Sequence, residues 1–307
     1  GQVHSSEGIM ASGVMSISVN TVFGLQAGGV GAIAGGTVYG LQAGGAFAFA
    51  EADFVGIQAA GAIAIADQDI AFGQYAGAVA IARGTVSGVQ ASGAFAYAGA
   101  VRGAQISVVN VAGRIEGVQI GVVNISNSMR GIPIGLVNII RDGIHDVVVT
   151  AAPNGARIDL SWLNGSQSFY SLVNGSYLGD GRLDAVRGVT AGIGIGTRLR
   201  SGGLFADLEL LASAAASGAG ASATLMNLFT AGDNAFLGGQ ARARMGLDFG
   251  GDFGFFASAE LFALVLEEAG SIPQLLTSDG FRPLRAPLPG SGLDLGIYPS
   301  VGLGVKF

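Results

Sequence analysis

Charged side chains recur at every second position in parts of the second half of the sequence, the spacing at which a β-strand turns residues to one face. They are Arg198, Arg200, Asp207, Glu209, Arg242, Arg244, Asp248 and Glu260. Short turns would bring Arg198 opposite or diagonal to Asp207, and Arg242 opposite Glu260. Such pairs in a pore wall would create a transverse field that orients polar solutes. Alternatively, they simply neutralise one another and stabilise the wall.

Single glutamines interrupt a face of glycine and alanine in the first half of the sequence. They are Gln26, Gln42, Gln58, Gln90, Gln105 and Gln119. Facing a lumen, they would make a wide, weakly polar wall. Such a wall suits the passage of bulky or partly apolar solutes, or the docking of a plug or partner protein. Alternatively, duplication spread a permissive sequence and the glutamines only keep the wall wetted.

Enzyme chemistry is not expected. The only histidines are His4 and His145, and His145 stands beside Asp146 near a predicted turn, where a solvated surface residue is the simpler interpretation. The chain has no cysteine, and no Cys/His cluster suggests a metal site. Its Gly-x-Gly strings lie in strand patterns instead of opening a helix as a phosphate loop does, so no cofactor is expected.

A glycine marks each repeat in the first half, with a spacing of about sixteen residues early and fourteen late. The marker glycines are Gly8, Gly24, Gly40, Gly56, Gly73, Gly88, Gly103, Gly117 and Gly131. The fourth interval, with Phe72 before Gly73, places its marker one residue out of register. The last three repeats add Asn110, Asn124 and Asn138. Each repeat is predicted to supply one strand of about ten to twelve residues and a turn.

The length of a repeat matches a membrane-spanning strand. Tyr39 and Phe49 would lie on one face at opposite ends of such a strand, and about ten tilted residues rise about 25 Å, the height of the apolar band between two aromatic girdles. The rival structure is a parallel β-solenoid, which constant repeat length and stacked Gln or Asn ladders also indicate. Because the second half loses the repeat but keeps the alternation, one barrel made by both halves is the preferred interpretation.

Composition places the chain in the membrane class. Half of its residues are hydrophobic, only 12% are charged, and residues 8–50 contain no Asp, Glu, Lys or Arg. The density of glycine argues for strands instead of helices. A net charge of −6 offers no basic surface for nucleic acid. No cationic, apolar segment precedes Gly1, so a mature chain whose export signal has been removed is expected.

The last strand carries a resemblance. Residues 295–307 alternate apolar with small or polar side chains and end on Phe307. This strand resembles the terminal strand of bacterial outer-membrane β-barrels, which implies an outer-membrane location. Residues 117–125 and 131–139 read GVQIGVVNI and GIPIGLVNI, and are similar to repeats in bacterial surface-repeat proteins. That family implies a surface location and no particular activity.

The sequence therefore predicts an all-β protein with one up-and-down antiparallel transmembrane barrel over residues 1–307, of sixteen strands, or eighteen as the alternative. Residues 8–140 form the repeat half, and residues 144–307 form the other half with the closing strand, which would pair beside the first repeat at residues 8–17. Residues 216–234 and 267–292 are predicted to be long loops.

The expected function is that of a passive porin-like channel for small solutes. The alternative is a non-conducting barrel that is structural or binds a partner in an envelope assembly. The expected partners are membrane lipid and either a second copy of the chain or another envelope protein, and nucleic acid is not expected.

Overall fold

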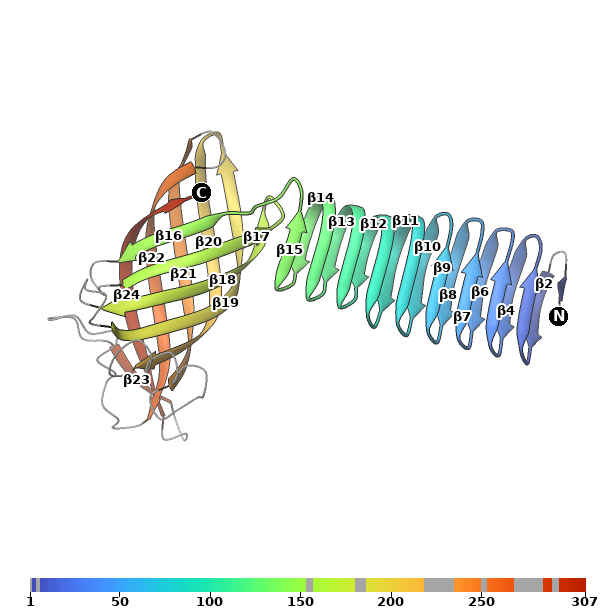
Figure 1. Ribbon diagram of the computed structural model, residues 1–307, viewed down its shortest axis with the longest axis horizontal. Helices are drawn as coiled ribbons and strands as arrows, with labels where there is room; N and C mark the ends of the chain where they lie inside the picture. Colours follow the sequence, from blue (N-terminus) through green and yellow to red (C-terminus); the bar gives the residue numbers. More distant parts are fainter. Residues whose placement is uncertain are drawn as a thin grey trace. The chain divides into compact units, whose positions relative to one another are not determined.

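The computed structural model describes residues 2–3, 6–152, 157–179, 186–217, 235–249, 253–267, 284–288 and 293–307. Every regular element among these residues is a β-strand. The chain divides into two compact units (Figure 1), which we call the solenoid unit, Gly1–Ile144 with Gly165–Gln167, and the barrel unit, His145–Asn164 with Ser168–Phe307. In the described part of the chain, no helix is long and apolar enough to cross a membrane.

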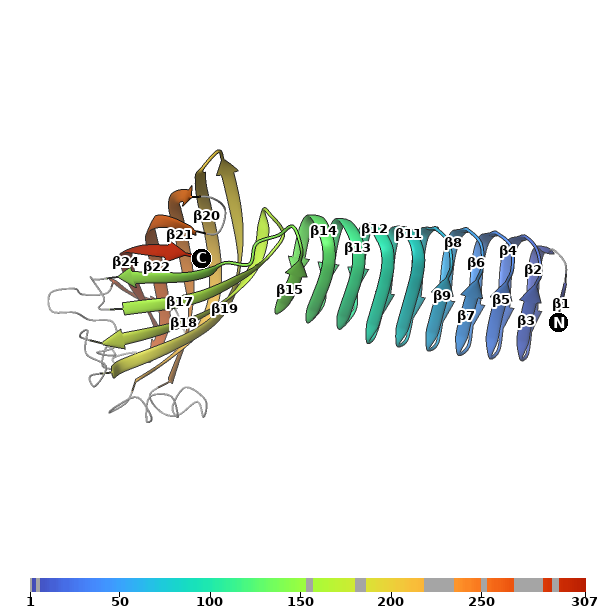
Figure 2. The same cartoon turned by 45° about the horizontal axis from the view of Figure 1, so that its top comes forward.

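The solenoid unit is a stack of coils in which each strand pairs in parallel with its equivalent in the next coil (Figure 2). Each early coil has a seven-residue strand and a four-residue strand, which form two rows. The long row is β2 (Ser6–Ser12), β4 (Val22–Gly28), β6 (Val38–Gly44), β8 (Phe54–Ala60) and β10 (Ile70–Ala76). The short row is β3 (Met15–Ser18), β5 (Gly31–Ala34), β7 (Phe47–Ala50) and β9 (Ile63–Ala66), and β1 (Gln2–Val3) pairs with β3.

Later coils join the two rows into longer continuous strands. These are β11 (Val79–Ser92), β12 (Phe95–Ile106), β13 (Val109–Ile120) and β14 (Val123–Ile134), followed by β15 (Val137–Ile140). The first part of β11 pairs with β9 and its second part with β10, so one parallel sheet runs through the unit. The core between the rows is thin because it is filled mainly by small or medium side chains such as Ala34, Val38 and Ala50.

A column of residues with positive φ runs along the long row. Gly24 has φ 119, and a Cβ there would lie 2.2 Å from the carbonyl oxygen of Gly8 in the preceding coil. In the fifth coil this position is taken by Phe72, with φ 91, which pairs with Gly56 and Gly88. The predicted shift of register at Gly73 is therefore wrong: the repeat is in register, and Phe72 replaces the marker glycine.

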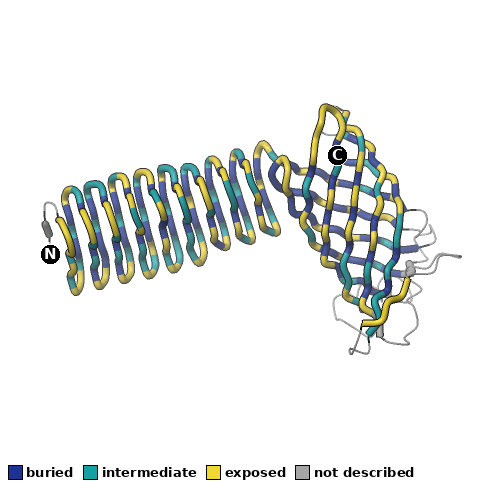
Figure 3. The backbone as a smooth tube through the Cα atoms, turned by 180° about the vertical axis from the view of Figure 1, so that it is seen from behind, coloured by how far each residue is buried: buried dark blue, intermediate teal, exposed yellow. Residues whose placement is uncertain are grey.

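The barrel unit is a closed antiparallel barrel of eight strands, in the order β16-β17-β18-β19-β20-β21-β22-β24. The strands are β16 (Val147–Ala152), β17 (Arg157–Gly165), β18 (Phe169–Gly179), β19 (Val186–Ser201), β20 (Leu204–Ser217), β21 (Ala235–Phe249), β22 (Phe253–Glu267) and β24 (Leu293–Lys306). Pairing of β16 with β24, from Val148 with Lys306 to Ala151 with Leu303, closes it. The short β23 (Leu284–Leu288) pairs with the beginning of β24. Buried and exposed residues alternate along the strands (Figure 3).

The predicted all-β class is confirmed, but a single barrel of sixteen or eighteen strands is not. The closed barrel has eight strands, and the repeats form a separate parallel sheet. A repeat of sixteen residues holds two strands because a tight Gly-rich turn, such as residues 29–30, folds it in the middle. Tyr39 and Phe49, expected at the two ends of one strand, consequently lie on β6 and β7, in different rows.

Two further expectations change with this topology. The C-terminal strand closes against β16 instead of against residues 8–17, because β2 to β5 pair only within the solenoid unit. Of the loops predicted at 216–234 and 267–292, residues 216–217 end β20, residue 267 ends β22 and residues 284–288 form β23, so the prediction is wrong there; the other residues of both loops, and His4, lie outside the described residues.

Candidate functional site

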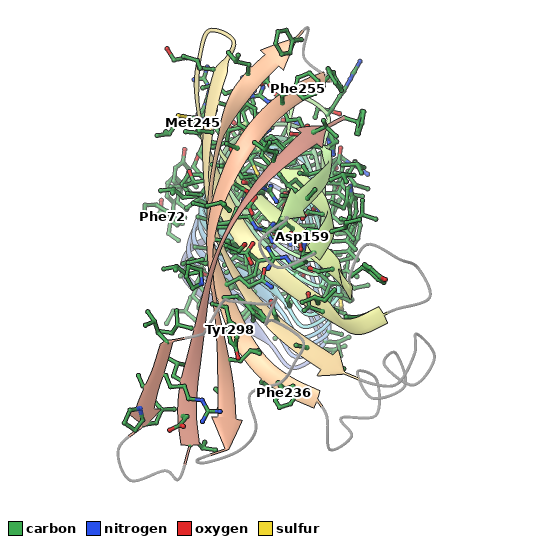
Figure 4. The ribbon with its side chains drawn as sticks, turned by 90° about the vertical axis from the view of Figure 1, so that its left-hand side faces the viewer. Phe72, Asp159, Phe236, Met245, Phe255 and Tyr298 are labelled. Atoms are coloured by element: carbon green, nitrogen blue, oxygen red, sulfur yellow. The ribbon has the colours of Figure 1, made fainter. Side chains whose placement is uncertain are left out.

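The interior of the barrel unit is the place where polar chemistry concentrates. Alternation along the strands turns large apolar side chains outward and charged ones inward. Met245 and Phe255 lie on the outside of the barrel and are more than half exposed, whereas Asp159 points inside and is fully buried (Figure 4). Other exposed outward residues are Ile158, Leu160, Ile193, Ile195, Leu208, Leu210, Leu261, Val301 and Leu303.

Glu260 on β22 is shared by two arginines. Arg157 on β17 approaches it with both terminal nitrogens, Nη1 to Oε1 and Nη2 to Oε2, each at 2.8 Å. Nε of Arg242 on β21 donates to the same Oε2 at 2.8 Å. Arg157 also pairs through Nε with Asp159, two residues along the same strand, at 3.0 Å. The fork of one guanidinium thus fixes two carboxylates at once.

Glu209 on β20 is the second centre of this network. Its Oε1 accepts from Nη1 of Arg244 at 2.6 Å and from the hydroxyl of Tyr170 at 2.8 Å. Its Oε2 lies 3.4 Å from Nη1 of Arg242. Since Arg242 contacts both Glu209 and Glu260, the two carboxylates belong to one continuous cluster.

Hydrogen bonds of this cluster cross the full width of the barrel. In the ring of eight strands, β17 and β21 are four places apart and so stand on opposite walls. The hydroxyl of Ser161 on β17 accepts from Nη1 of Arg242 and Nη2 of Arg244 on β21, each at 3.4 Å. Asn174 on β18 also donates to Ser161, at 2.9 Å. At this level, polar side chains from opposite walls meet in the middle of the lumen.

A second cluster surrounds Arg198 on β19. Its Nε and Nη2 bind the two oxygens of Asp207 at 2.7 and 2.8 Å, and its Nη1 lies 2.5 Å from Asp146. Its guanidinium also lies over the ring of Phe205, 5.0 Å from the centroid. Lys306 contacts Asp248 at 2.9 Å and Asp146 at 3.6 Å. The C-terminal strand is therefore tied to this cluster by its only lysine.

The buried charges of the barrel balance. Among the described side chains, the five buried cations are Arg157, Arg198, Arg242, Arg244 and Lys306, and the five buried carboxylates are Asp146, Asp159, Asp207, Glu209 and Glu260. Each of these groups has at least one oppositely charged partner within 4.0 Å. Pairing of this kind offsets the cost of removing the charges from water. These ten charges sum to zero, and Asp248, whose side chain is 12% exposed, adds one more carboxylate beside Lys306.

The structure brings together seven of the eight charged residues singled out from the sequence and adds others. Arg198 stands directly opposite Asp207, and Arg242 opposite Glu260. Arg200 lies apart from the buried clusters, with a side chain 42% exposed and 3.7 Å from Asp248. Sequence reasoning missed Arg157, Asp159, Ser161 and Tyr170, and it considered Asp146 only as the neighbour of His145 in a predicted turn, not as a buried partner of Arg198. The alternation of Arg157, Asp159 and Ser161 was a signal that could have identified three of them.

The repeat glutamines were predicted to face a barrel lumen. They are instead buried in the core of the solenoid unit. From Gln42 onward, each Nε2 donates to Oε1 of the glutamine one coil earlier, at 2.8 to 3.0 Å, and most also donate to a carbonyl of the short row, as Gln42 does to Phe49. Gln26, the first of the ladder, donates to the carbonyls of Ser16 and Ile33. The ladder comprises Gln26, Gln42, Gln58, Gln74, Gln90, Gln105 and Gln119. Gln74 was missed because Phe72 occupies the marker position of its coil, so Gly73 was taken as the marker glycine and the repeat was read one residue out of register.

An asparagine ladder runs beside the later glutamines in the opposite sense. Nδ2 of Asn110 donates to Asn124 at 2.9 Å, and Nδ2 of Asn124 donates to Asn138 at 2.7 Å, each time toward the following coil. The glutamine ladder ends at Gln119 because Pro133, its neighbour in the next coil, has no side-chain donor. The two ladders place columns of hydrogen-bonded amide side chains beside the apolar residues of the solenoid core.

The pair His145-Asp146 does not form one site. His145 is exposed, whereas Asp146 is buried against Arg198 in the barrel. Within the described ranges, no three His, Cys, Asp or Glu side chains are grouped so that they could hold a metal ion. No protein-family model, curated protein or solved structure matches this chain.

Proposed function

We propose that the barrel unit is an outer-membrane anchor with a sealed lumen: a structural, non-conducting barrel that holds the solenoid unit at the cell envelope. The apolar residues on the outward face of the barrel are the evidence for a lipid environment. Leu199, Leu208 and Leu237 are each more than 60% exposed, and such residues recur on neighbouring strands. Seven of the eight barrel strands, from nine residues in β17 to sixteen in β19, reach the roughly 9–11 residues that a tilted strand needs to cross a bilayer, and the described part of β16 has six.

The main support for a sealed lumen is the contact of Ser161 with Arg242 and Arg244, which reach it from the opposite wall of the barrel. An eight-stranded barrel is just wide enough for its own side chains to fill, whereas barrels of about sixteen to eighteen strands leave an aqueous channel. Here the filling side chains are also joined by ion pairs. Opening a passage would require separating several of these buried pairs. A charge that stays buried without its partner destabilises the protein by about 3–5 kcal/mol.

The porin-like channel expected from the sequence has less support. A transverse field needs positive and negative walls that face water and each other across a gap. In this barrel, the residues that would supply such walls, Arg242, Glu209 and Glu260, contact one another directly and are buried.

Planar-bilayer recording on the purified full-length protein tests the sealed lumen. We expect no stable single-channel steps from correctly folded wild-type protein. Stable steps whose ion selectivity changes in Arg242→Ala would overturn the proposal.

The single tryptophan tests the membrane location separately. Trp162 lies on β17 with its side chain on the outer surface of the barrel, 40% exposed. In phosphatidylcholine vesicles, brominated lipid should quench its emission and aqueous iodide should not. The variant Trp162→Phe has no tryptophan and gives the background emission that comes from tyrosine. Quenching by iodide alone would contradict embedding of the barrel.

A further inference from the structure

Charge is confined to one edge of the solenoid unit. Each coil turns twice: once from long row to short row, as at residues 29–30, and once from short row to the next long row, as at residues 35–37. All twelve charged residues of positions 1–144 lie at the second kind of turn or on the adjoining two residues of the long row, which we call the charged edge. They are Glu7, Glu51, Asp53, Asp67, Asp69, Arg83, Arg102, Arg114, Glu116, Arg130, Arg141 and Asp142.

The opposite edge carries no charge in any coil, and we call it the charge-free edge. Its outermost column is Val14, Val30, Ala46, Ala62, Ala78, Ala94, Val108, Val122 and Leu136. Val14, Val108, Val122 and Leu136 are about half exposed or more. A surface edge of a water-soluble protein ordinarily carries charged side chains, so nine successive coils without a charge at this edge favour an apolar environment.

Both outer faces next to this edge are apolar as well. On the short row, the in-register outward column is Ile17, Ile33, Phe49, Ile65, Ile81, Tyr97, Val111, Ile125 and Ile139. On the long row, Leu25, Leu41 and Ile57 follow one another outward, and Ile57 is 44% exposed. The apolar surface therefore continues from one face around the charge-free edge to the other face.

The backbone at the charge-free edge is hydrogen-bonded from coil to coil. The amide of Val30 donates to Val14 at 2.8 Å, that of Ala46 to Val30 at 2.7 Å, and that of Ala62 to Ala46 at 2.8 Å. The same bond recurs between Val122 and Val108. Hydrocarbon tolerates a turn only where its amide groups find partners within the protein, and this edge meets that requirement.

We propose that the solenoid unit lies edge-on in a lipid surface, with its charge-free edge immersed in hydrocarbon and its charged edge in the headgroup layer. A seven-residue strand measures about 23 Å, enough for one edge to reach the middle of a hydrocarbon core about 30 Å thick while the other stays outside. A second copy packed on one flat face would leave the other face and the edge uncovered, whereas lipid covers all three. The inference goes beyond the barrel anchor and does not depend on it.

Site-directed spin labelling tests the proposal, because the chain has no native cysteine. Val122→Cys labels the charge-free edge and Asn127→Cys labels the charged edge of the same coil; both side chains are exposed. Val30→Cys and Asn20→Cys repeat the comparison near the other end of the unit. The full-length protein is studied in phosphatidylcholine vesicles with two collision reagents, oxygen, which concentrates in hydrocarbon, and a water-soluble nickel chelate.

We expect labels at positions 122 and 30 to collide mainly with oxygen, and those at 127 and 20 mainly with nickel. Equal access of nickel to both edges would overturn the proposal. So would shielding of position 122 from both reagents together with spin–spin broadening, because that result places a second copy on the edge. Quenching of Trp162 by brominated lipid is measured on the same vesicles, so a barrel that fails to insert is distinguished from a solenoid edge that stays in water.

Discussion

Phe72 is the one residue that breaks the strictest rule of the repeat. At the equivalent position, eight coils have glycine with positive φ, and Phe72 alone has φ 91 with a side chain. Residues other than glycine adopt this conformation at a cost of about 1–3 kcal/mol. The side chain is 67% exposed, so it recovers little of that cost by packing. The fifth coil is therefore a strained point in an otherwise regular stack.

Phe72→Gly should stabilise the solenoid unit. Relief of strain outweighs the greater backbone entropy that glycine gives the unfolded chain, about 0.4–1 kcal/mol, and leaves a net gain of about 1 kcal/mol. Thermal or denaturant unfolding of the full-length protein measures it. Gly88→Ala is the matched control in the next coil. A Cβ at Gly88 would lie 1.9 Å from the carbonyl oxygen of Phe72, so this variant should be destabilised. An unchanged or lowered stability of Phe72→Gly would contradict the argument.

At the scale of elements, the amide ladders hold the coils in register. A glutamine in mid-ladder makes bonds to both neighbouring coils: Gln58 donates to Gln42 and to the carbonyl of Ile65, and accepts from Gln74. Gln119, at the end of the ladder, donates to Gln105, and its Oε1 has no hydrogen-bond partner. The contribution of a glutamine should therefore depend on its place in the ladder.

Gln58→Met should destabilise the solenoid unit by about 3 kcal/mol, because the change keeps the volume but removes three buried hydrogen bonds, with Gln42, Ile65 and Gln74, at about 0.5–1.5 kcal/mol each. Gln119→Met should cost about 1 kcal/mol, since it deprives only Gln105 of a partner. Denaturant unfolding of the two variants compares them. Equal losses would show that the ladder does not act through its neighbour-to-neighbour bonds.

The ladders also explain which elements the sequence could predict. Period-two alternation of small inward and large outward residues is the same in a transmembrane strand and in this solenoid, since both have an apolar outside. In a coil such as residues 38–50, the alternation of small and large residues continues through the turn at Gly45-Ala46, between β6 and β7, so the sequence pattern of two strands looks like that of one. The in-register glutamines and asparagines were the better indicator, because stacked amides need parallel neighbours at the spacing of a sheet.

At the scale of the whole molecule, the C-terminal half was the more predictable one. Inward charges on β19 to β22 follow strict alternation, and a charge facing lipid would cost about 2–4 kcal/mol, so their direction followed from the sequence. The number of strands in the barrel could not be derived from the sequence in the same way. The pairing that closes the ring, Val148 with Lys306, joins residues more than a hundred positions apart, and so does the ion pair of Arg157 with Glu260, so no local pattern specifies them.

Two compact units should unfold in two transitions. Glu260→Gln removes the carboxylate shared by Arg157 and Arg242, and should lower the stability of the barrel transition by about 3–5 kcal/mol while leaving the solenoid transition unchanged. Differential scanning calorimetry in detergent measures both. Arg200→Gln is the control, because this half-exposed ion pair should contribute no more than about 1 kcal/mol. A single transition that shifts with Glu260→Gln would contradict independent units.

The coil-by-coil register of the solenoid unit has a consequence for its evolution. Because residue i of each early coil stacks on residue i + 16 of the next, as Gly24 does on Gly40 and Gln26 on Gln42, removal or duplication of a whole coil preserves every column. Each such event changes the length of the stack by one strand spacing, about 4.8 Å. The length of the solenoid unit can therefore change during evolution in fixed steps of one coil, while the contacts between neighbouring coils stay the same.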